Sequence, residues 1–110
     1  MSHLSEHKSL SDSSLNLWLN QSDQQLVLVV FKADWAGGVA ILKGFIDKIL
    51  IEMPGVQVYW VDVESNKDLS LSFGINQIPS IIMLRDHEVV DHINGILPRR
   101  KLSARMARHL

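Results

Sequence analysis

Two kinds of apolar run alternate along the chain, and this alternation predicts an α/β domain. Residues 26–31 form an unbroken, largely β-branched apolar run, which is typical of a strand buried on both faces of a sheet. Residues 56–63 predict a second strand. Between these strands, residues 39–53 repeat apolar side chains at helical spacing, and the pair Pro54-Gly55 predicts the end of that helix.

The second half of the chain predicts a hairpin. Residues 80–84 and 88–93 are strand-like, and they flank Asp86-His87, two residue types that tolerate the positive φ of a tight turn. Because a helix joins the first two strands, we expect them to be parallel, whereas the strands of the hairpin are antiparallel. Further helices are predicted over residues 11–21, 65–71 and 98–110. The expected architecture is a mixed sheet of four strands with helices on both faces.

The length and composition of the chain suit one domain with its own core. The chain has 110 residues, and its hydrophobic fraction of 46% argues against disorder. Residues 1–9 are polar and unpatterned, so we expect a flexible N-terminal tail followed by a domain over residues 10–110. No apolar stretch approaches the ~18 residues of a membrane span, and the N-terminus lacks the apolar segment of a signal peptide. We therefore expect a cytoplasmic protein without membrane contacts.

The formal net charge of −1 conceals an uneven distribution of charges. Residues 1–98 carry six basic and twelve acidic side chains, whereas residues 99–110 carry five basic and no acidic ones. Four of these basic residues are candidate contacts for an anionic partner: Arg100, Lys101, Arg105 and Arg108. The alternative is an ordinary solvated helix face, and nucleic acid is not the partner we expect.

Cysteine is absent from the sequence, which excludes structural disulfides, thiolate metal sites and thiol catalysis. The histidines do not supply a zinc ligand set, because His3 and His7 lie in the expected tail while His87 and His92 flank the hairpin. We expect these to be surface histidines. No group of residues supplies a nucleophile, a base and an orienting side chain together. Neither a metal nor a cofactor is expected.

Three blocks of the sequence, in their order and spacing, resemble the thioredoxin family. They are residues 29–35 before the long helix, residues 73–80 with their proline, and the pair Asn94-Gly95 before the closing helix. The resemblance covers residues 10–110. It implies a thioredoxin-like three-layer α/β/α sandwich with a mixed sheet of four to five strands.

The resemblance also identifies what this sequence lacks. The family signature is a tryptophan, a cysteine, two spacer residues and a second cysteine, whereas here Trp35 is followed by Ala36, Gly37-Gly38 and Val39. Neither Ala36 nor Val39 can form the thiolate that attacks a disulfide. The chain is therefore not expected to be a thiol–disulfide oxidoreductase, and no other enzyme activity is predicted.

Two further family positions are apolar in this chain. A buried aspartate and its lysine partner, which serve proton transfer to the buried thiol in the family, correspond to Val30 and Trp60. Without the thiol, a buried charge is costly and serves no reaction. Four coordinated replacements by apolar residues indicate an active site that has become part of the core.

The block around Ile78-Pro79 keeps a feature of the family. In relatives this proline follows a cis peptide bond, and the backbone before it pairs with an extended segment of a client protein, which needs no thiol. The implied binding face combines this loop with the former active-site segment, and its candidate residues are Trp35, Ala36, Gly37, Gly38, Ile78, Pro79 and Gly95. The alternatives are that Pro79 only shapes its loop and that Trp35 only packs over the loop for stability.

The resemblance thus implies a redox-inactive thioredoxin-like protein that binds a protein or peptide client or assists assembly. Cysteine-free relatives of this kind include hydrogenase-assembly chaperones and phosducin-like scaffolds. An alternative is a subunit of a homodimer or larger complex whose interface is the former active-site face. A thiol-free enzyme is a third hypothesis, for which the sequence offers no site.

Overall fold

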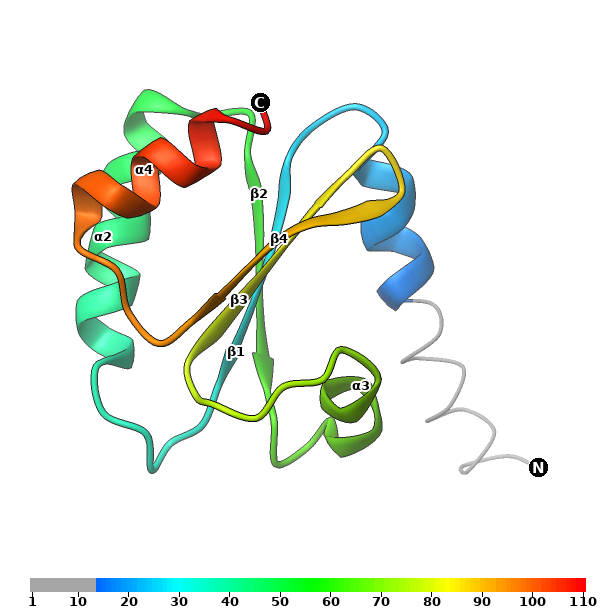
Figure 1. Cartoon of the computed structure of the whole chain (residues 1–110), viewed down its shortest axis with the longest axis vertical. Helices are drawn as coiled ribbons and strands as arrows, with labels where there is room; N and C mark the ends of the chain where they lie inside the picture. The colour runs from blue at the N-terminus through cyan, green and yellow to red at the C-terminus, as the bar shows by residue number, and fades with distance from the viewer. Residues whose placement is uncertain (1–13) are drawn as a thin grey trace.

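Four strands form one mixed sheet in residues 14–110, the part of the chain that the computed structural model describes (Figure 1). A helix over residues 14–21 comes first. The elements that follow are β1 (Val27–Lys32), α2 (Val39–Glu52), β2 (Gln57–Asp62), α3 (Lys67–Ser72), β3 (Ser80–Arg85), β4 (Glu88–Asn94) and α4 (Arg99–Ala107). The tail expected over residues 1–9, and the start of the helix expected at residue 11, lie outside the described residues. No helix within residues 14–110 has the length and apolar character needed to cross a lipid bilayer.

The strand order is β2-β1-β3-β4, so the first strand of the described residues lies inside the sheet. β1 runs parallel to β2 and antiparallel to β3, and β3 forms an antiparallel hairpin with β4. These directions confirm the mixed sheet that the sequence predicts. At the hairpin turn, Asp86 and His87 have φ values of 55° and 65°, the left-handed conformation that such a turn requires.

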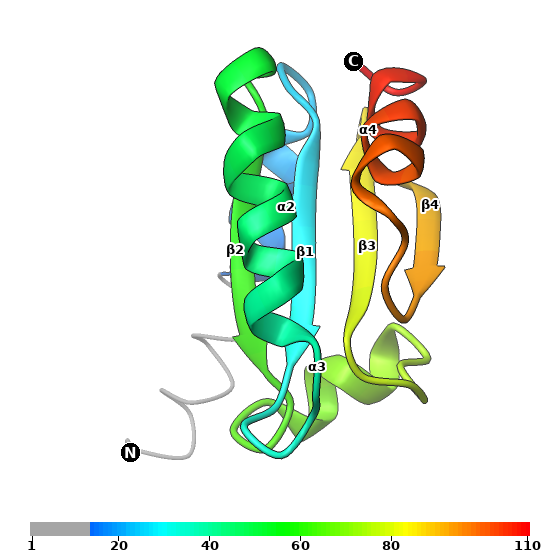
Figure 2. The same cartoon turned by 90° about the vertical axis from the view of Figure 1, so that its left-hand side faces the viewer.

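Helices cover both faces of the sheet and produce the three layers of the fold (Figure 1). α2 and α4 lie on one face, where Leu28 and Met106 are among the buried residues. The helix over residues 14–21 and α3 cover the other face, where Trp18 and Phe31 are buried. Figure 2 shows α2 over β2 and β1, with α4 over the neighbouring pair of strands. β1 therefore supplies buried side chains to both faces, as its unbroken apolar run predicts.

A cluster of charged groups joins α4 to β4. Asp91 on β4 accepts hydrogen bonds from Nε and Nη2 of Arg105, and the Nε–Oδ2 distance is 2.7 Å. Nε2 of His109 lies 3.2 Å from the same carboxylate. The hydrogen bonds from Arg105, supported by those from His109 and the N–H of His92, outweigh burial and lower the pKa of Asp91 from 3.8 to about 2. Arg105 therefore already has an acidic partner within the protein, and its assignment as a contact for an anionic partner stays a prediction.

Replacing Asp91 with asparagine is expected to destabilise the protein by about 2 kcal/mol at neutral pH, which corresponds to a pKa lowered from 3.8 to about 2. Because the folded-state pKa lies below the unfolded one, this contribution is present above about pH 4 and is lost as the pH falls toward 2. The free energies of unfolding of Asp91→Asn and wild type, measured with urea, should therefore differ at neutral pH and converge near pH 2. If the free energies of unfolding of the two proteins differed by the same amount at neutral pH and near pH 2, the lowered pKa of Asp91 would not be the cause of the difference.

Candidate functional site

Three loops meet at one end of the molecule because the strand register brings their origins together. Phe31 near the end of β1 pairs with Ser80 at the start of β3, and Ser80 pairs with Asn94 at the end of β4. The loops that follow β1, precede β3 and follow β4 therefore leave the sheet at its lower end in Figure 1: residues 33–38, 73–79 and 95–98. We call this region the three-loop end. It contains every residue of the binding face that the family resemblance implies.

Two glycines allow these loops to approach one another. Gly38 has a φ of 84°, and a side chain on it would collide with Ile96 in the loop after β4. Gly95 has a φ of 79°, and a Cβ atom there would lie 3.1 Å from Nε2 of Gln77. Gly95 also donates its N–H to the carbonyl of Pro79 at 2.8 Å. Close backbone contact therefore fixes the three loops relative to one another.

Trp35 projects from the loop after β1, and 67% of its surface is exposed. This exposure disfavours the alternative in which its ring packs over the loop for stability. Ile96 is 37% exposed, while Ile78 is half-buried against the core on the α3 side of the sheet. The three-loop end thus presents the apolar side chains of Trp35 and Ile96 from two of its loops. The side chain of Ile78, in the third loop, is partly covered.

The loop before β3 contains a short stretch of open backbone. The Ile78–Pro79 peptide bond is cis. Within residues 14–110, neither the N–H nor the carbonyl of Ile78 takes part in a hydrogen bond. Its neighbours are satisfied, because the carbonyl of Pro79 accepts from Gly95 and the carbonyl of Gln77 accepts from the Ser80 hydroxyl at 2.5 Å. Backbone groups of this kind normally find a partner, so those of Ile78 are open to one.

The segment that corresponds to the family's cysteines leads into α2. The N–H of Ala36 donates to the carbonyl of Ala33 at 3.1 Å, and Gly37 is exposed. Gly38 precedes Val39, the first residue of α2, without a side-chain cap. Both Ala36 and Val39 are half-buried, and neither carries a nucleophilic atom. This segment therefore contributes shape and apolar surface rather than a reacting group.

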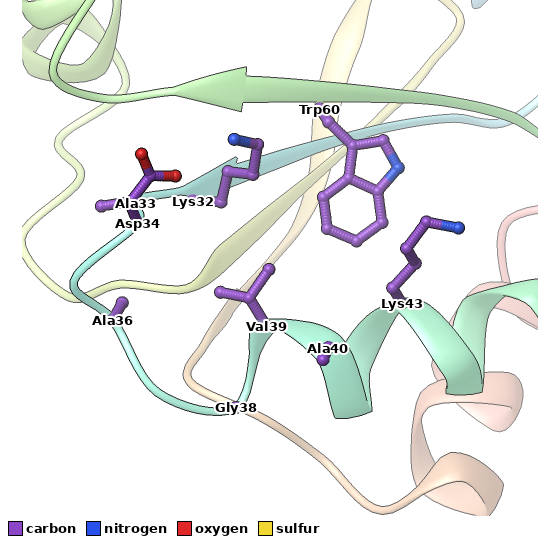
Figure 3. A pocket seen from close by; sticks show the side chains of 9 residues that line it. All are labelled: Lys32, Ala33, Asp34, Ala36, Gly38, Val39, Ala40, Lys43 and Trp60. Carbon is purple, nitrogen blue, oxygen red and sulfur yellow. The ribbon is translucent and has the colours of Figure 1, made fainter.

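A pocket of about 570 Å³ lies between α2 and β2, and residues of the loop after β1 form part of its lining (Figure 3). The register pairs Val30 with Trp60, so the residues that replace the family's acid and lysine lie side by side. Val30 is fully buried, whereas the half-buried Trp60 ring forms one wall of the pocket and points toward α2. The complete lining comes from β1, β2, α2 and the connecting loop: Lys32, Ala33, Asp34, Ala36, Gly38, Val39, Ala40, Lys43 and Trp60.

Sequence reasoning placed Ala36 and Gly38 at the site but missed the two lysines of this pocket. Lys32 ends β1, and Lys43 lies on α2 one turn after Val39. Two signals were available, since loops at the carboxyl ends of parallel strands often bind ligands and residues four apart share a helix face. Neither signal indicates that the end of β1 and this face of α2 line the same pocket, because that depends on how the two elements pack in the fold.

The remaining basic residues of the C-terminal segment lie outside the pocket. Arg99, Arg100 and Lys101 form the first turn of α4 and are exposed, and Arg108 is exposed directly after the helix. The first three follow the loop after β4, whereas Arg108 lies at the other end of α4 near the C-terminus, and none of the four lines the pocket. No acidic side chain occupies the first turn of α4 to offset them.

The histidines are separated by the fold. Nδ1 of His87 lies 2.6 Å from Oδ1 of Asp23, while His109 belongs to the cluster that joins α4 to β4. His92 is half-buried, and its Nε2 atom is buried without a hydrogen-bond partner, which corrects the expectation of surface histidines at this position. Within residues 14–110, no three His, Asp or Glu side chains are grouped as metal ligands would be. His3 and His7 lie outside the described residues.

Comparison with known proteins agrees with this fold. The family profile described as Thioredoxin matches residues 6–108. The chain is 28% identical over 102 residues to Thioredoxin 1 of Nostoc sp., an alignment that covers 92% of this chain and 94% of the relative. It is 35% identical over 79 residues to Thioredoxin C-2 of Corynebacterium nephridii, covering 71% of this chain and 73% of the relative.

The three-dimensional comparison gives the same answer. The X-ray structure of Fasciola hepatica thioredoxin superposes with a TM-score of 0.80 at 24% sequence identity, and the match covers 90% of this chain and 94% of that one. The shared fold and the profile match over nearly the whole sequence show that this chain belongs to the thioredoxin family.

Proposed function

We infer that the protein is a redox-inactive thioredoxin-family member that binds an extended segment of another protein at the three-loop end. The relatives in the comparison are named thioredoxins, but this chain has Ala36 and Val39 at the positions of the family's cysteines. Disulfide exchange requires a thiolate, so this reaction is not available to the chain. Client binding through main-chain groups is the part of the family's activity that the remaining residues support.

The open backbone of Ile78 carries this proposal. An extended peptide that pairs with an exposed strand-like segment gains affinity from main-chain hydrogen bonds, and its specificity comes from pockets for alternate side chains. The N–H and carbonyl of Ile78 are the groups that such a peptide would use. Pairing them would exchange hydrogen bonds to water for main-chain hydrogen bonds to the peptide.

In this proposal Trp35, in another loop of the three-loop end, provides the apolar anchor. Tryptophan is enriched among the residues that dominate binding energy, because its ring offers a large contact area with few rotatable bonds. A ring that is 67% exposed in the free protein contributes little to folding and has most of its surface available for a partner. The arrangement therefore fits recognition rather than core packing.

The proposal is tested by selecting a random peptide library against the immobilised full chain and titrating an enriched peptide by fluorescence anisotropy. Trp35→Ala is expected to weaken binding about 30-fold or more, the effect of losing a hot-spot residue. Its urea midpoint should change little, because truncating an exposed side chain alters stability by about 0.5 kcal/mol or less. Ile51→Ala is the matched control, since Ile51 is 81% exposed near the opposite end of α2. It should change neither quantity.

Two results would contradict client binding at this surface. One is a peptide whose affinity is the same for wild type and Trp35→Ala. The other is loss of stability and binding in equal measure, which would assign Trp35 a structural role. If the wild type instead sediments as a dimer and Trp35→Ala sediments as a monomer, the three-loop end is a subunit interface, the alternative that the sequence leaves open.

A further inference from the structure

We propose that the pocket between α2 and β2 is a binding site for a small organic anion with a planar aromatic body. The pocket shares Ala36 and Gly38 with the three-loop end, but not the two residues that carry the proposed peptide binding. Trp35 does not line the pocket, and Ile78 lies in a different loop. The proposal rests on the shape of the pocket, the Trp60 ring and two lysines.

The pocket exists because small residues face a large one. Val39 and Ala40 form the first turn of α2, and Figure 3 shows them on the side of the pocket opposite Trp60. Side chains of this size do not fill the space in front of the indole ring. The volume of about 570 Å³ falls within the range of about 300–1,000 Å³ that small-molecule sites occupy.

The walls of the pocket indicate a ligand with an aromatic body. The ring of Trp60 is flat and half-buried, and the residues opposite are aliphatic. An indole ring stacks favourably on another aromatic ring and also gains from burial of apolar area. A polar ligand without rings would not cover the Trp60 ring or the aliphatic residues opposite it, so an aromatic or fused-ring compound fits the pocket better.

The charges of the pocket indicate an anion. Lys32 and Lys43 line it from β1 and α2, and Asp34 is the acidic side chain of the lining, while Asp62 and Asp47 pair with the two lysines from outside the lining. Figure 3 shows the two lysine side chains on either side of Trp60. A ligand with a single carboxylate next to its ring system would replace one of these outer aspartates as the partner of a lysine, and its rings would cover the apolar wall.

Both lysines have partners that a ligand can compete with. Nζ of Lys43 lies 3.1 Å from Asp47 on the surface of α2, where the two side chains are 62% and 61% exposed. Nζ of Lys32 lies 3.8 Å from Asp62. Exposed ion pairs of this kind contribute little to stability, and a lysine side chain reorients readily about its four-carbon stem. Either ammonium group can therefore turn toward a bound carboxylate without loss of the fold.

The test uses 2-naphthoate and its uncharged analogue 2-naphthalenemethanol as probes, titrated into the ¹⁵N-labelled full chain and followed by NMR. We expect both probes to shift the indole N–H signal of Trp60 and the amide signals of Lys32 and Lys43. The indole signals of Trp18 and Trp35 should stay in place. The carboxylate is expected to bind about fivefold more tightly than the alcohol, the magnitude of a partly exposed charge contact.

Substitutions at the pocket separate charge from shape. The double variant Lys32→Gln with Lys43→Gln should bind the two probes equally, whereas Lys48→Gln, an exposed lysine of α2 outside the pocket, should keep the fivefold preference. Ala40→Leu should weaken both probes about tenfold or more, because leucine is a good helix former and fills the space before Trp60. The NMR spectrum of each variant reports whether it is folded.

Three outcomes would overturn the proposal. The first is a set of shifts centred on residues outside the pocket. The second is equal affinity of the wild type for the two probes, which would remove the role of the lysines. The third is unaltered binding by folded Ala40→Leu. Because Trp35→Ala leaves the pocket intact, loss of peptide binding in that variant with retained naphthoate binding would show that the two sites are separate.

Discussion

Insulin reduction by dithiothreitol is expected to proceed at its uncatalysed rate in the presence of this protein. The chain contains no cysteine, so no thiolate is available to form the mixed disulfide through which exchange proceeds. The measurement is the turbidity of precipitating insulin chains, with a cysteine-containing thioredoxin as the positive control. An acceleration comparable to that of the control would show that the chain catalyses exchange by other chemistry.

Restoring the cysteines alone is expected to restore only weak activity. In the double variant Ala36→Cys with Val39→Cys, the positions of the family's buried acid and lysine are still occupied by Val30 and Trp60, neither of which can move a proton. Adding Val30→Asp and Trp60→Lys to that variant should increase the rate further, because the register places these two positions side by side. Full activity in the two-cysteine variant would show that the buried pair contributes little.

The single substitution Val30→Asp is expected to destabilise the protein by about 3–5 kcal/mol at neutral pH, the cost of an uncompensated buried charge. Val30 is 0% exposed, so burial would raise the pKa of the introduced carboxyl. With a folded-state pKa above the unfolded value of about 3.9, the free energy of unfolding falls as the pH rises through that value. Urea unfolding across this range measures the slope.

Two further variants isolate the charge from the change in shape. Val30→Asn introduces a polar group of similar size that does not titrate, so its cost should be independent of pH. Adding Trp60→Lys to Val30→Asp should recover part of the stability by pairing the charge across β1 and β2. A loss in Val30→Asp that does not vary with pH would show that the charge of the introduced carboxylate is not what destabilises the protein.

The sheet was predictable because local patterns determine it. The unbroken apolar run predicts a strand inside the sheet, and β1 has neighbours on both sides and is buried on both faces. The Asp86-His87 pair predicts the hairpin, and both residues have positive φ. Only boundaries moved, since the strand predicted over residues 56–63 is observed over Gln57–Asp62. Such ends depend on hydrogen bonds that a pattern does not specify.

The candidate site was predictable only in part, because it depends on contacts between distant segments. The sequence pattern places Arg105 on the last helix, but it does not indicate that Asp91 on another element lies within reach of its guanidinium. The pocket depends on how far α2 stands from Trp60, and this distance follows from the packing of the whole layer. The exposure of Trp35 likewise follows from the course of its loop, since a tryptophan in a sequence is more often covered.

The position of β1 in the sheet has a consequence for the nascent chain. β1 is synthesised before both of its neighbours, because Val27 pairs with Gln57 on one side and with Leu84 on the other. Five of its six residues are buried in the finished protein, so this segment leaves the ribosome before either neighbour exists. An unpaired apolar strand is prone to aggregate. Protection by a chaperone would therefore matter most between the emergence of β1 and the completion of β3.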